Sequence, residues 1–487
     1  MPGKYETVIG VEIHVELGTR TKLFCGCSAD FGADINTQTC PVCLGMPGAL
    51  PVLNAKALEY GIKAALAMNC HISDHSIFER KNYFYPDLPK GYQISQLRKP
   101  LSHNGYVEIK AQGNGMTKKI GIRRIHLEDD AAKLVHAGEG EIDEAMNSAV
   151  DFNRGGIPLI EIVSDPDMRS PEEMKAYCET VKSILEYIEV SDCDMEKGHL
   201  RIEANISVRD ADNPNITTDR SEIKNLNSVR NAMKAVEYEV KRHTKALESG
   251  GTLAMETRLF DVDRGVTRAM RGKEEAHDYR YFPEPDLVPI EPDRFWVDEL
   301  QNTLPELPHE RQRRFVHSYE LPEYDSSLLV SDKKLADYYE TCVRAYNKPK
   351  IVSNWILNEL MALLGNSKQT ISECKIKPEH FAGMMKLVDD GTISGKIAKT
   401  IYEEMFATGS HADVIVKEKG LIQITDEDEI SKIIDQVIMD NPGPAGDYRN
   451  GQKKAAGFLV GQVMKISKGK ANPQLVNKIL AEKLEQK

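Results

Sequence analysis

A run of seven residues near the N-terminus limits what this chain can fold into more than any other stretch. Apolar residues alternate strictly with ionisable ones along residues 11–17: the apolar set is Val11, Ile13, Val15 and Leu17, and the ionisable set is Glu12, His14 and Glu16. Successive side chains of a strand point to opposite faces, so the run predicts a strand with one buried face. The other face then carries oxygen and nitrogen donors that suit a hard divalent cation, although an amphipathic strand with a charged, solvated face explains the same pattern.

Length and cysteine content limit the class of protein. A chain of 487 residues is too long for one compact core, which predicts two to four domains. The start, MPGKYETVIG, lacks the features of a secretory signal, and no apolar run approaches the ~20 residues of a membrane span. Nine cysteines in such a chain favour a reducing compartment over a disulfide framework. We therefore expect a cytoplasmic protein.

Four of the cysteines form two close pairs, Cys25 with Cys27 and Cys40 with Cys43. Two such pairs separated by a short loop can close a tetrahedral zinc site, and a site filled by four thiolates would brace the fold without an open position for catalysis. The first pair is CxC rather than the more usual CxxC, and free thiols are the alternative.

Aromatic and basic side chains alternate in residues 80–96, RKNYFYPDLPKGYQISQ. With Arg80, Lys81 and Lys90 interleaved among its rings, this segment is suited to stack on a base and to hold phosphates. An ordered loop that packs its rings onto the core is the alternative. Nothing in the chain matches the phosphate-binding pattern GxxxxGK[ST], so any nucleotide is bound in another way.

Two later stretches offer ligands of the same chemical kinds. Residues 121–127 predict a strand that ends at Glu128, Asp129 and Asp130, which could complete an ion site begun elsewhere. Residues 151–162 contain Asn153 and Arg154 beside two glycines, a combination that offers donors to a phosphate or a carboxylate.

The second half of the chain changes character. From about residue 291 it becomes a series of amphipathic helices without catalytic clusters, and a further change falls near residues 407–411. Although the net charge is −12, the stretch from Tyr448 to Ala481 contains no acidic residue. Its basic side chains favour a nucleic-acid contact, with a solvated helical face as the alternative; they include Arg449, Lys453, Lys454, Lys465, Lys468 and Lys470.

Several long motifs, in order along the chain, resemble those of the B-subunit family of the aspartyl/glutamyl-tRNA(Asn/Gln) amidotransferases. They are VIGVEIHVEL, RKNYFYPDLPKGYQISQ, HLEDDAAK, VDFNRGGIPLIEIVSDPD, EIKNLNS, EEAHDYRYFPEPDL and LPELPHERQRRF, followed by the tail GFLVGQVMK and KGKANPQLVNKIL. The similarity runs through essentially the whole chain.

The resemblance implies an α+β fold. It implies a large cradle-like catalytic domain with a mixed sheet over residues 1–292, an all-helical domain over 293–407, and a small helical tail domain over 408–487 that contacts tRNA. It also implies a carbon–nitrogen ligase that takes its nitrogen from glutamine. The partners implied are the glutaminase and the small third component of the amidotransferase, together with tRNA(Gln), tRNA(Asn) or both.

The reaction implied converts Glu-tRNA(Gln), Asp-tRNA(Asn) or both into the corresponding amides. A carboxylate is a poor electrophile, so ATP would first phosphorylate the side chain, and ammonia would then displace the phosphate. Phosphoryl transfer needs positioning and charge neutralisation more than a protein nucleophile.

The resemblance also assigns site residues. Those implied for catalysis are Glu12, His14, Lys81 and Glu128, with Mg²⁺ held by Glu12, His14 and Glu128, and structural zinc held by the four paired cysteines. Candidates for binding ATP or the aminoacyl end are Asn82, Tyr83, Arg154, Arg201 and Asn205. Glu203 stands where the family usually has Asp.

Two other classes of function fit parts of the sequence. A non-enzymatic, zinc-containing scaffold that binds tRNA explains the cysteines and the basic stretch, but leaves the acidic cluster without a purpose. A metal-dependent hydrolase uses the acidic cluster but has no need of the basic stretch, and no HExxH motif is present. ATP consumption that depends on aminoacyl-tRNA separates both from the amidotransferase.

Overall fold

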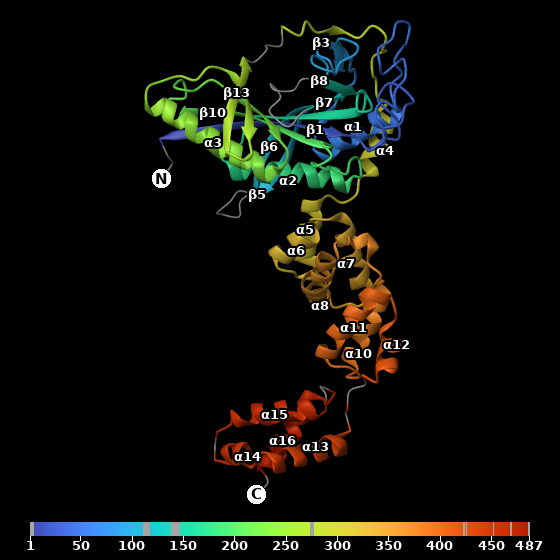
Figure 1. The fold of residues 1–487 in the computed structure, drawn as a ribbon, viewed down its shortest axis with the longest axis vertical. Coiled ribbons are helices and arrows are strands. Elements are labelled where there is room, and N and C mark those ends of the chain that lie inside the picture. The colour runs from blue at the N-terminus through green and yellow to red at the C-terminus, as the bar shows by residue number, and fades with distance from the viewer. Residues whose placement is uncertain are drawn as a thin grey trace. The chain divides into compact units, whose positions relative to one another are not determined.

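A computed structural model describes residues 4–110, 117–137, 147–272, 277–421, 424, 426–450, 452–467 and 470–485 (Figure 1). The chain divides into two compact units, residues 1–308 and residues 309–487. Among the described residues, no helix combines the length and the apolar character that crossing a lipid bilayer requires.

The described part of the first unit is built on a mixed sheet of nine strands in the order β13-β12-β11-β10-β1-β9-β6-β5-β2. Its neighbouring strands are antiparallel, except for the parallel pair β11 and β12. The strands are β1 (Tyr5–Glu16), β2 (His71–Ile72), β5 (Ser102–Lys110), β6 (Thr117–Asp129), β9 (Pro158–Ser164), β10 (Leu200–Asp210), β11 (Ser221–Leu226), β12 (Glu256–Asp261) and β13 (Val266–Gly272). The alternating run that predicted a strand lies in β1, the middle strand of this sheet.

Smaller elements complete the first unit. One further sheet has the order β14-β3-β4, and β7 pairs with β8. These strands are β3 (Glu79–Asn82), β4 (Tyr92–Ser95), β7 (Lys133–Ala137), β8 (Asn147–Asp151) and β14 (Phe282–Pro283). The helices are α1 (Ala55–Ala67), α2 (Pro171–Tyr187), α3 (Val229–Glu248) and α4 (Arg294–Asn302).

The period-two pattern of β1 divides the large sheet into a dry face and a polar face. Ile9, Val11, Ile13 and Val15 are at most 1% exposed and belong to the main core of this unit. Helices α1, α2 and α3 pack against this face (Figure 1). Burial of each large apolar side chain contributes about 1.5–3 kcal/mol, so the helices fix which face of the sheet stays polar.

Helix α2 begins as its sequence predicts. The hydroxyl of Ser170 accepts a hydrogen bond from the backbone N–H of Glu173, and Pro171 occupies the first helical position. The carboxylate of Glu173 accepts from the backbone N–H of Arg169 at 2.8 Å, one residue before the cap. One face of this helix, including Met174, Val181 and Leu185, is buried in the core.

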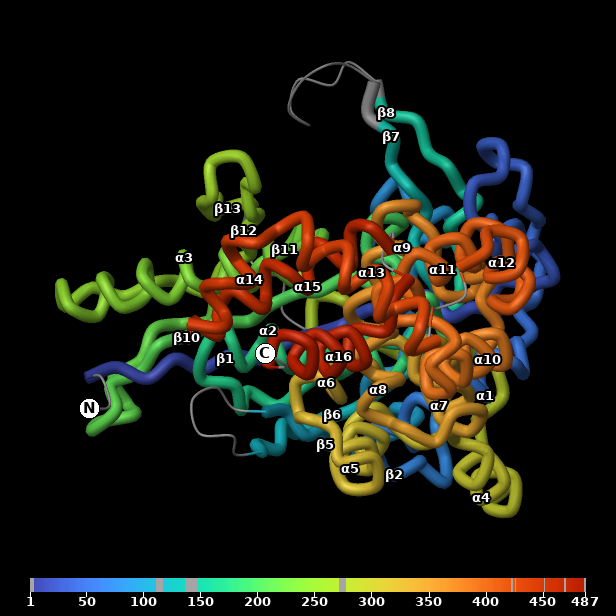
Figure 2. The backbone as a smooth tube through the Cα atoms, turned by 90° about the horizontal axis from the view of Figure 1, so that it is seen from below, coloured from blue at the N-terminus to red at the C-terminus, as the bar shows by residue number. Residues whose placement is uncertain are grey.

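The described part of the second unit is helical, and Figure 2 follows its backbone from α5 to α16. Its α-helices are α5 (Pro308–Tyr319), α6 (Glu323–Leu329), α7 (Lys333–Ala345), α8 (Pro349–Asn354), α9 (Met361–Ser367), α10 (Pro378–Asp389), α11 (Gly395–Thr408), α12 (Ala412–Lys419), α13 (Glu427–Asp440), α14 (Pro442–Arg449), α15 (Ala455–Ile466) and α16 (Pro473–Glu485). A π-helix spans Trp355–Leu360 and a 3₁₀-helix spans Ile371–Glu373.

Two separate apolar cores hold these helices. One draws on buried residues from Phe315 to Val416, and the other on buried residues from Ile430 to Leu484. The prediction of an α+β fold, with a mixed sheet followed by helices, is confirmed. The division of the chain at residues 292 and 407 stays a prediction.

Candidate active site

The polar face of the central sheet brings together ionisable side chains from adjacent strands. His14 of β1 lies opposite Glu161 of β9 on one side and opposite Arg201 of β10 on the other. Glu161 in turn lies opposite His126 of β6. Facing residues of antiparallel strands are about 5 Å apart at Cβ, whereas side chains two residues apart on one strand are roughly 7 Å apart. The closest ionisable neighbours of His14 therefore come from other strands.

His14, Glu128 and Glu161 form the densest cluster on this face. The Nε2 atom of His14 lies 3.5 Å from a carboxylate oxygen of Glu128 and 3.6 Å from one of Glu161. Behind them, the buried Nε2 atom of His126 lies 3.2 Å from Glu161 and 3.7 Å from Glu128. One ligand atom from each member of the cluster lies within 4.8 Å of the other two. An imidazole and two carboxylates fit a divalent cation that keeps positions open for substrate oxygens.

The electrostatics of this cluster favour a bound positive charge. Burial alone would lower the pKa of His14, but the hydrogen bond and charge of Glu161, with the charge of Glu128, raise this pKa to about 9. Burial alone would raise the pKa of Glu161, but His126 and His14 bring it well below its ordinary value. The carboxylates are thus ionised and neutralised by imidazolium, and a divalent cation could supply the same charge.

Glu12 lies two residues before His14 on β1, on the same polar face of the sheet. Its carboxylate accepts a hydrogen bond from the side-chain amide of Asn205 at 3.0 Å, and its partner across the strands is Glu203. Burial, followed by the neighbouring carboxylates, raises the pKa of Glu12. Glu203 accepts two hydrogen bonds from Lys224, at 3.1 and 3.0 Å, so this glutamate is already paired. The structure therefore joins Glu12 to Asn205 rather than to the imidazole of His14.

Two arginines that sequence analysis proposed as ligands of phosphate or of the aminoacyl end meet at Asp130. Arg201 donates two hydrogen bonds to Asp130, at 2.8 and 3.0 Å, and lies 3.7 Å from Glu16. Arg154 lies 3.5 Å from Asp130 and donates to two backbone carbonyls of the following loop, at 3.0 and 2.9 Å. A guanidinium has five N–H donors, so both side chains are held in place and keep donors beyond these contacts.

Lys81, Asn82 and Tyr83 continue from strand β3. Burial alone would lower the pKa of Lys81, but neighbouring tyrosines and the carboxylates of Glu128 and Glu161 raise it. This ammonium group is therefore close enough to the acidic cluster to respond to its charge. The side-chain N–H bonds of Asn82 are committed to backbone carbonyls of a later segment, at 3.0 and 3.2 Å. Burial raises the pKa of Tyr83 above its ordinary value.

The four paired cysteines converge into one cluster. One ligand atom from each of Cys25, Cys27, Cys40 and Cys43 lies within 4.8 Å of the others, and the sulfur atoms of Cys40 and Cys43 are 3.9 Å apart. Zn–S bonds of 2.3 Å in a tetrahedron require sulfur atoms about 3.8 Å apart, so the cluster fits zinc. The wholly buried Lys22 directs its ammonium at Cys43 over 3.7 Å and donates to a backbone carbonyl at 3.1 Å.

Removal of a metal from this cluster is expected to lower stability and to leave turnover of the folded protein unchanged. A Cys40→Ser variant loses one thiolate, and we expect its melting temperature to fall by roughly 6 °C, which corresponds to about 3 kcal/mol. Differential scanning calorimetry with and without a chelator measures the change. Cys374→Ser, outside the cluster, is the control. Lost turnover at unchanged melting temperature would assign the metal to catalysis instead.

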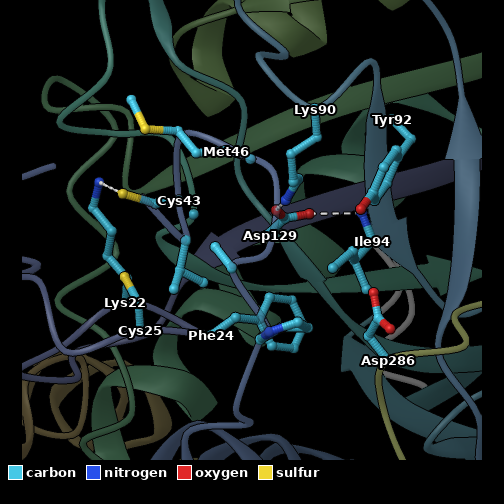
Figure 3. Close-up of a pocket in the computed structure, with 15 residues that line it drawn as sticks. Lys22, Phe24, Cys25, Cys43, Met46, Lys90, Tyr92, Ile94, Asp129 and Asp286 are labelled. Carbon is cyan, nitrogen blue, oxygen red and sulfur yellow. Dashed lines mark hydrogen bonds and ion pairs between the residues drawn. The ribbon is translucent and has the colours of Figure 1, made fainter. Parts of the chain in front are cut away.

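A cavity of about 160 Å³ lies between the cysteine cluster and the end of β6 (Figure 3). Gly45 has a left-handed backbone (φ +65°), and a Cβ at this position would lie only 2.4 Å from a carbon of Lys90. Lys90 forms an ion pair with Asp129, which also accepts from the backbone N–H of Ile94 at 2.7 Å. A side chain at position 45 would therefore push on Lys90 and, through the ion pair, on Asp129, the residue next to Glu128. This contact links the turn of the cysteine cluster to the candidate site.

The acid-free stretch covers the end of α14, the whole of α15 and most of α16. Among the described residues, Arg449, Lys453, Lys454 and Lys465 are exposed and form no ion pair, and Lys470 is half-buried. Lys468 lies outside the described residues. Four unpaired positive side chains on one small helical body fit a polyanionic partner.

Glu161 and His126 are not among the site residues predicted from the sequence. Each is an ionisable residue between two apolar ones, Glu161 within LIEIV and His126 within RIHLE. RIHLE alternates as β1 does, which marks His126 as a polar-face residue, whereas Glu161 is a single ionisable residue in an otherwise apolar run. Their approach to His14 depends on the pairing of the strands, which no local signal reveals.

Comparison with known proteins adds independent information. Two family models match the chain: one described as the GatB/GatE catalytic domain over residues 7–298, and one described as the GatB domain over residues 337–484.

Curated relatives match along almost the whole chain. A protein of Carboxydothermus hydrogenoformans, named as the B-subunit of an aspartyl/glutamyl-tRNA(Asn/Gln) amidotransferase, is 55% identical over 481 residues, which is 99% of each chain. A Thermoanaerobacter protein of the same name is also 55% identical over 481 residues. The Geotalea daltonii protein of that name is 51% identical over 482 residues, 99% of this chain and 100% of its own. The resemblance found in the sequence motifs is confirmed.

Proposed function

This chain belongs to the GatB/GatE family of amidotransferase subunits, whose enzymes are glutamine-dependent carbon–nitrogen ligases, and on that premise we propose its reaction. The proposed substrate is Glu-tRNA(Gln), Asp-tRNA(Asn) or both. The chain uses ATP to phosphorylate the side-chain carboxylate and then lets ammonia replace the phosphate. The cluster of His14, Glu128 and Glu161 beside Lys81 is the observation that carries this proposal.

The first step transfers the γ-phosphoryl group of ATP to an oxygen of the substrate carboxylate. The products are ADP and an acyl phosphate, and the reacting groups bring several negative charges together. The ammonium of Lys81 is suited to neutralise charge on the transferring phosphoryl group, because its pKa is raised and it remains protonated. His14, Glu128 and Glu161 would hold a Mg²⁺, which would supply positive charge to offset that of the phosphate oxygens. Glu12 is proposed to act from its position two residues before His14, where the hydrogen bond from Asn205 orients its carboxylate.

In the second step ammonia attacks the carbonyl carbon of the acyl phosphate. The C–N bond forms as the C–O bond to phosphate breaks, and inorganic phosphate leaves with the surplus proton of ammonia. Arg201 and Arg154 are proposed to bind the phosphate or the aminoacyl end, because Asp130 holds both guanidiniums in place while each keeps unused donors. Asn82 and Tyr83 are proposed to line the same site.

Several partners follow from this reaction. The glutaminase of the amidotransferase would supply ammonia, and its small third component would join the assembly. The names of the relatives, which call each the B-subunit of an aspartyl/glutamyl-tRNA(Asn/Gln) amidotransferase, support a multi-subunit enzyme that acts on tRNA. ATP and Mg²⁺ are the proposed cofactors of the acidic cluster, and zinc is the proposed structural ion of the cysteines.

We expect the basic helical tail to contribute phosphate contacts to tRNA. Replacement of Arg449, Lys453, Lys454 and Lys465 by alanine should reduce tRNA affinity at least about 10-fold at low salt. It should also lower the slope of log K against log salt by roughly 3, since each lost phosphate contact removes about 0.7–0.9. Fluorescence titration of labelled tRNA across a salt series measures both quantities.

The control for the tail has the same change in charge. Four exposed lysines elsewhere in the second unit, Lys334, Lys368, Lys377 and Lys396, are replaced by alanine in a matched variant. This control should keep most of the affinity and the slope. Equal losses in the two variants would mean that net charge, rather than the tail, governs tRNA binding.

The function itself is tested on the complete assembly. The chain is combined with the glutaminase and the small third component and given glutamine, ATP, Mg²⁺ and Glu-tRNA or Asp-tRNA, and the amino acid on the tRNA is then identified by mass spectrometry. We expect Gln or Asn to appear only when ATP is present. Bound tRNA without any conversion would support the alternative of a non-enzymatic, zinc-containing scaffold.

A further inference from the structure

The motif HDYRYFPEPD has no role in the reaction described so far, yet its described residues return to the strand that carries Lys81. The backbone N–H of Asn82 donates to the carbonyl of Tyr279 at 3.0 Å, and the side-chain amide of Asn82 donates to the carbonyls of Tyr279 and Arg280. Beyond them, Phe282 of β14 pairs with Arg80 of β3. The segment that follows residue 276 is thus attached on either side of Lys81.

Two aromatic rings lie against the Lys81 ammonium as a result. Its Nζ atom lies 4.9 Å from the ring centre of Tyr279 and 5.7 Å from that of Tyr83. Tyr279 makes edge-to-face contacts with both Tyr83 and Tyr281, with ring centres 5.9 and 6.1 Å apart. Both lysine–ring distances are within the roughly 6 Å over which a cation is attracted to a ring face.

Aromatic rings contact Lys81, whereas carboxylates contact two other lysines of this unit. Lys90 forms an ion pair with Asp129, and Lys224 lies 3.0 Å from Glu203. In the described part of the chain, no carboxylate oxygen lies within 4.0 Å of the Lys81 ammonium. A carboxylate offsets the charge of an ion-paired lysine and occupies at least one of its three N–H bonds, whereas a ring face attracts the ammonium without an opposing charge.

We propose that Tyr279 and Tyr281 are positioning residues for Lys81. With Tyr83 they form a tyrosine cage (Tyr83, Tyr279 and Tyr281) that fixes the ammonium beside the acidic cluster without neutralising it, so that its N–H bonds can bind the transferring phosphoryl group. The inference rests on the proposed function, because it assigns Lys81 to the phosphoryl group of ATP. Tyr281 supports the ring of Tyr279 through an edge contact, with ring centres 6.1 Å apart.

A series of substitutions at position 279 tests the ring face directly in the complete assembly. We expect Tyr279→Phe to retain most of the rate of ATP-dependent amide formation, because the ring face remains. Tyr279→Leu should lower kcat by about 5- to 30-fold with an unchanged KM for tRNA. Phenylalanines with one, two and three fluorine atoms keep the ring shape but weaken its negative face, so log kcat should fall in steps along this series.

A second cation–ring pair in the same unit provides the control. The ammonium of Lys119, near the start of β6, lies 3.8 Å from the ring centre of Tyr106 of β5, whereas Glu128 lies at the other end of β6, so Tyr106→Leu should leave kcat unchanged. Equal kcat values throughout the fluorinated series, in an assembly whose wild-type chain forms the amide, would overturn the cage. Failure of the wild-type chain to form any amide with ATP would instead refute the proposed function.

Discussion

Replacement of His14 by alanine is expected to reduce ATP-dependent amide formation by about 100- to 1,000-fold while tRNA binding survives. The imidazole is the member of the cluster that faces both carboxylates, at 3.5 and 3.6 Å. Its loss leaves the carboxylates of Glu128 and Glu161 with one fewer positive partner. The negatively charged phosphate and carboxylate of the reacting groups must still be brought to the same place. Removal of a single group that stabilises developing charge typically costs a factor of this size. Single-turnover formation of the amide on labelled aminoacyl-tRNA measures the rate.

Two further variants sharpen this expectation. Glu128→Gln keeps the shape of the side chain but removes its charge, and we expect a loss of the same order as for His14→Ala. His126 lies behind the cluster, only 2% exposed, and contacts the carboxylates rather than solvent. His126→Ala should therefore cost less, about 10- to 100-fold, as for groups that orient metal ligands. A parallel loss of tRNA affinity in these variants would count against a role in phosphoryl transfer.

The second large effect is expected on stability, at a buried carboxylate outside the candidate site. Glu239 of α3 is fully buried and is surrounded by donors: Arg242 at 2.7 Å, Arg258 at 3.2 Å, His243 at 3.3 Å and the hydroxyl of Thr267. Burial alone would raise the pKa of Glu239, but the hydrogen bonds from His243, Arg242 and Thr267 lower it to about 2. Glu239→Gln removes the charge on which this network depends. We expect a cost of about 3–5 kcal/mol at pH 7, as for breaking a buried ion pair.

The pH dependence of that cost has a definite sign. A carboxylate whose pKa falls from 4.5 to about 2 on folding stabilises the folded state above pH 4.5, by about 3 kcal/mol. This stabilisation is lost as the pH falls from 4.5 through 2, because over this range the unfolded state binds a proton that the folded state does not. The stability difference between the wild-type chain and Glu239→Gln should therefore shrink over this range.

Urea unfolding at pH 7 and pH 3 checks this expectation. Of the two tryptophans, Trp296 packs against the core of the first unit and Trp355 against a core of the second. In a Trp355→Phe background, fluorescence therefore reports the unfolding of the unit that contains Glu239. Glu248→Gln, at the exposed end of the same helix, is the control and should change little. A difference between wild type and Glu239→Gln that is constant with pH would mean that packing, rather than charge, holds this network.

Local patterns in the sequence predict much of the fold. The alternation in residues 11–17 gives β1 and its dry face, and the cap at Ser170 gives the start of α2. Both rest on neighbouring residues alone, and both are present in the structure. The helical second half follows from its amphipathic pattern, and the mixed character of the sheet follows from the family resemblance.

The composition of the site was only partly predictable, because register is a long-range property. Residues 12, 14 and 16 lie on one strand face, so the pattern favours them as a set of metal ligands. Their spacing of roughly 7 Å is nevertheless wide for one small ion. The backbone N–H of Val11 meets the hydroxyl of Ser164 across 153 positions of chain, and this pairing of β1 with β9 brings Glu161 to His14. The tyrosine cage likewise depends on β14 returning to β3.

Isotope transfer tests the central claim most directly. Glu-tRNA or Asp-tRNA carrying ¹⁸O in its side-chain carboxylate is converted by the complete assembly, and the inorganic phosphate is analysed by mass spectrometry. Phosphorylation of the carboxylate predicts that one ¹⁸O atom enters phosphate for each amide formed, because the C–O bond breaks on the carbon side of that oxygen. Unlabelled phosphate, released while the amide forms, would contradict an acyl phosphate and with it the assigned role of this site.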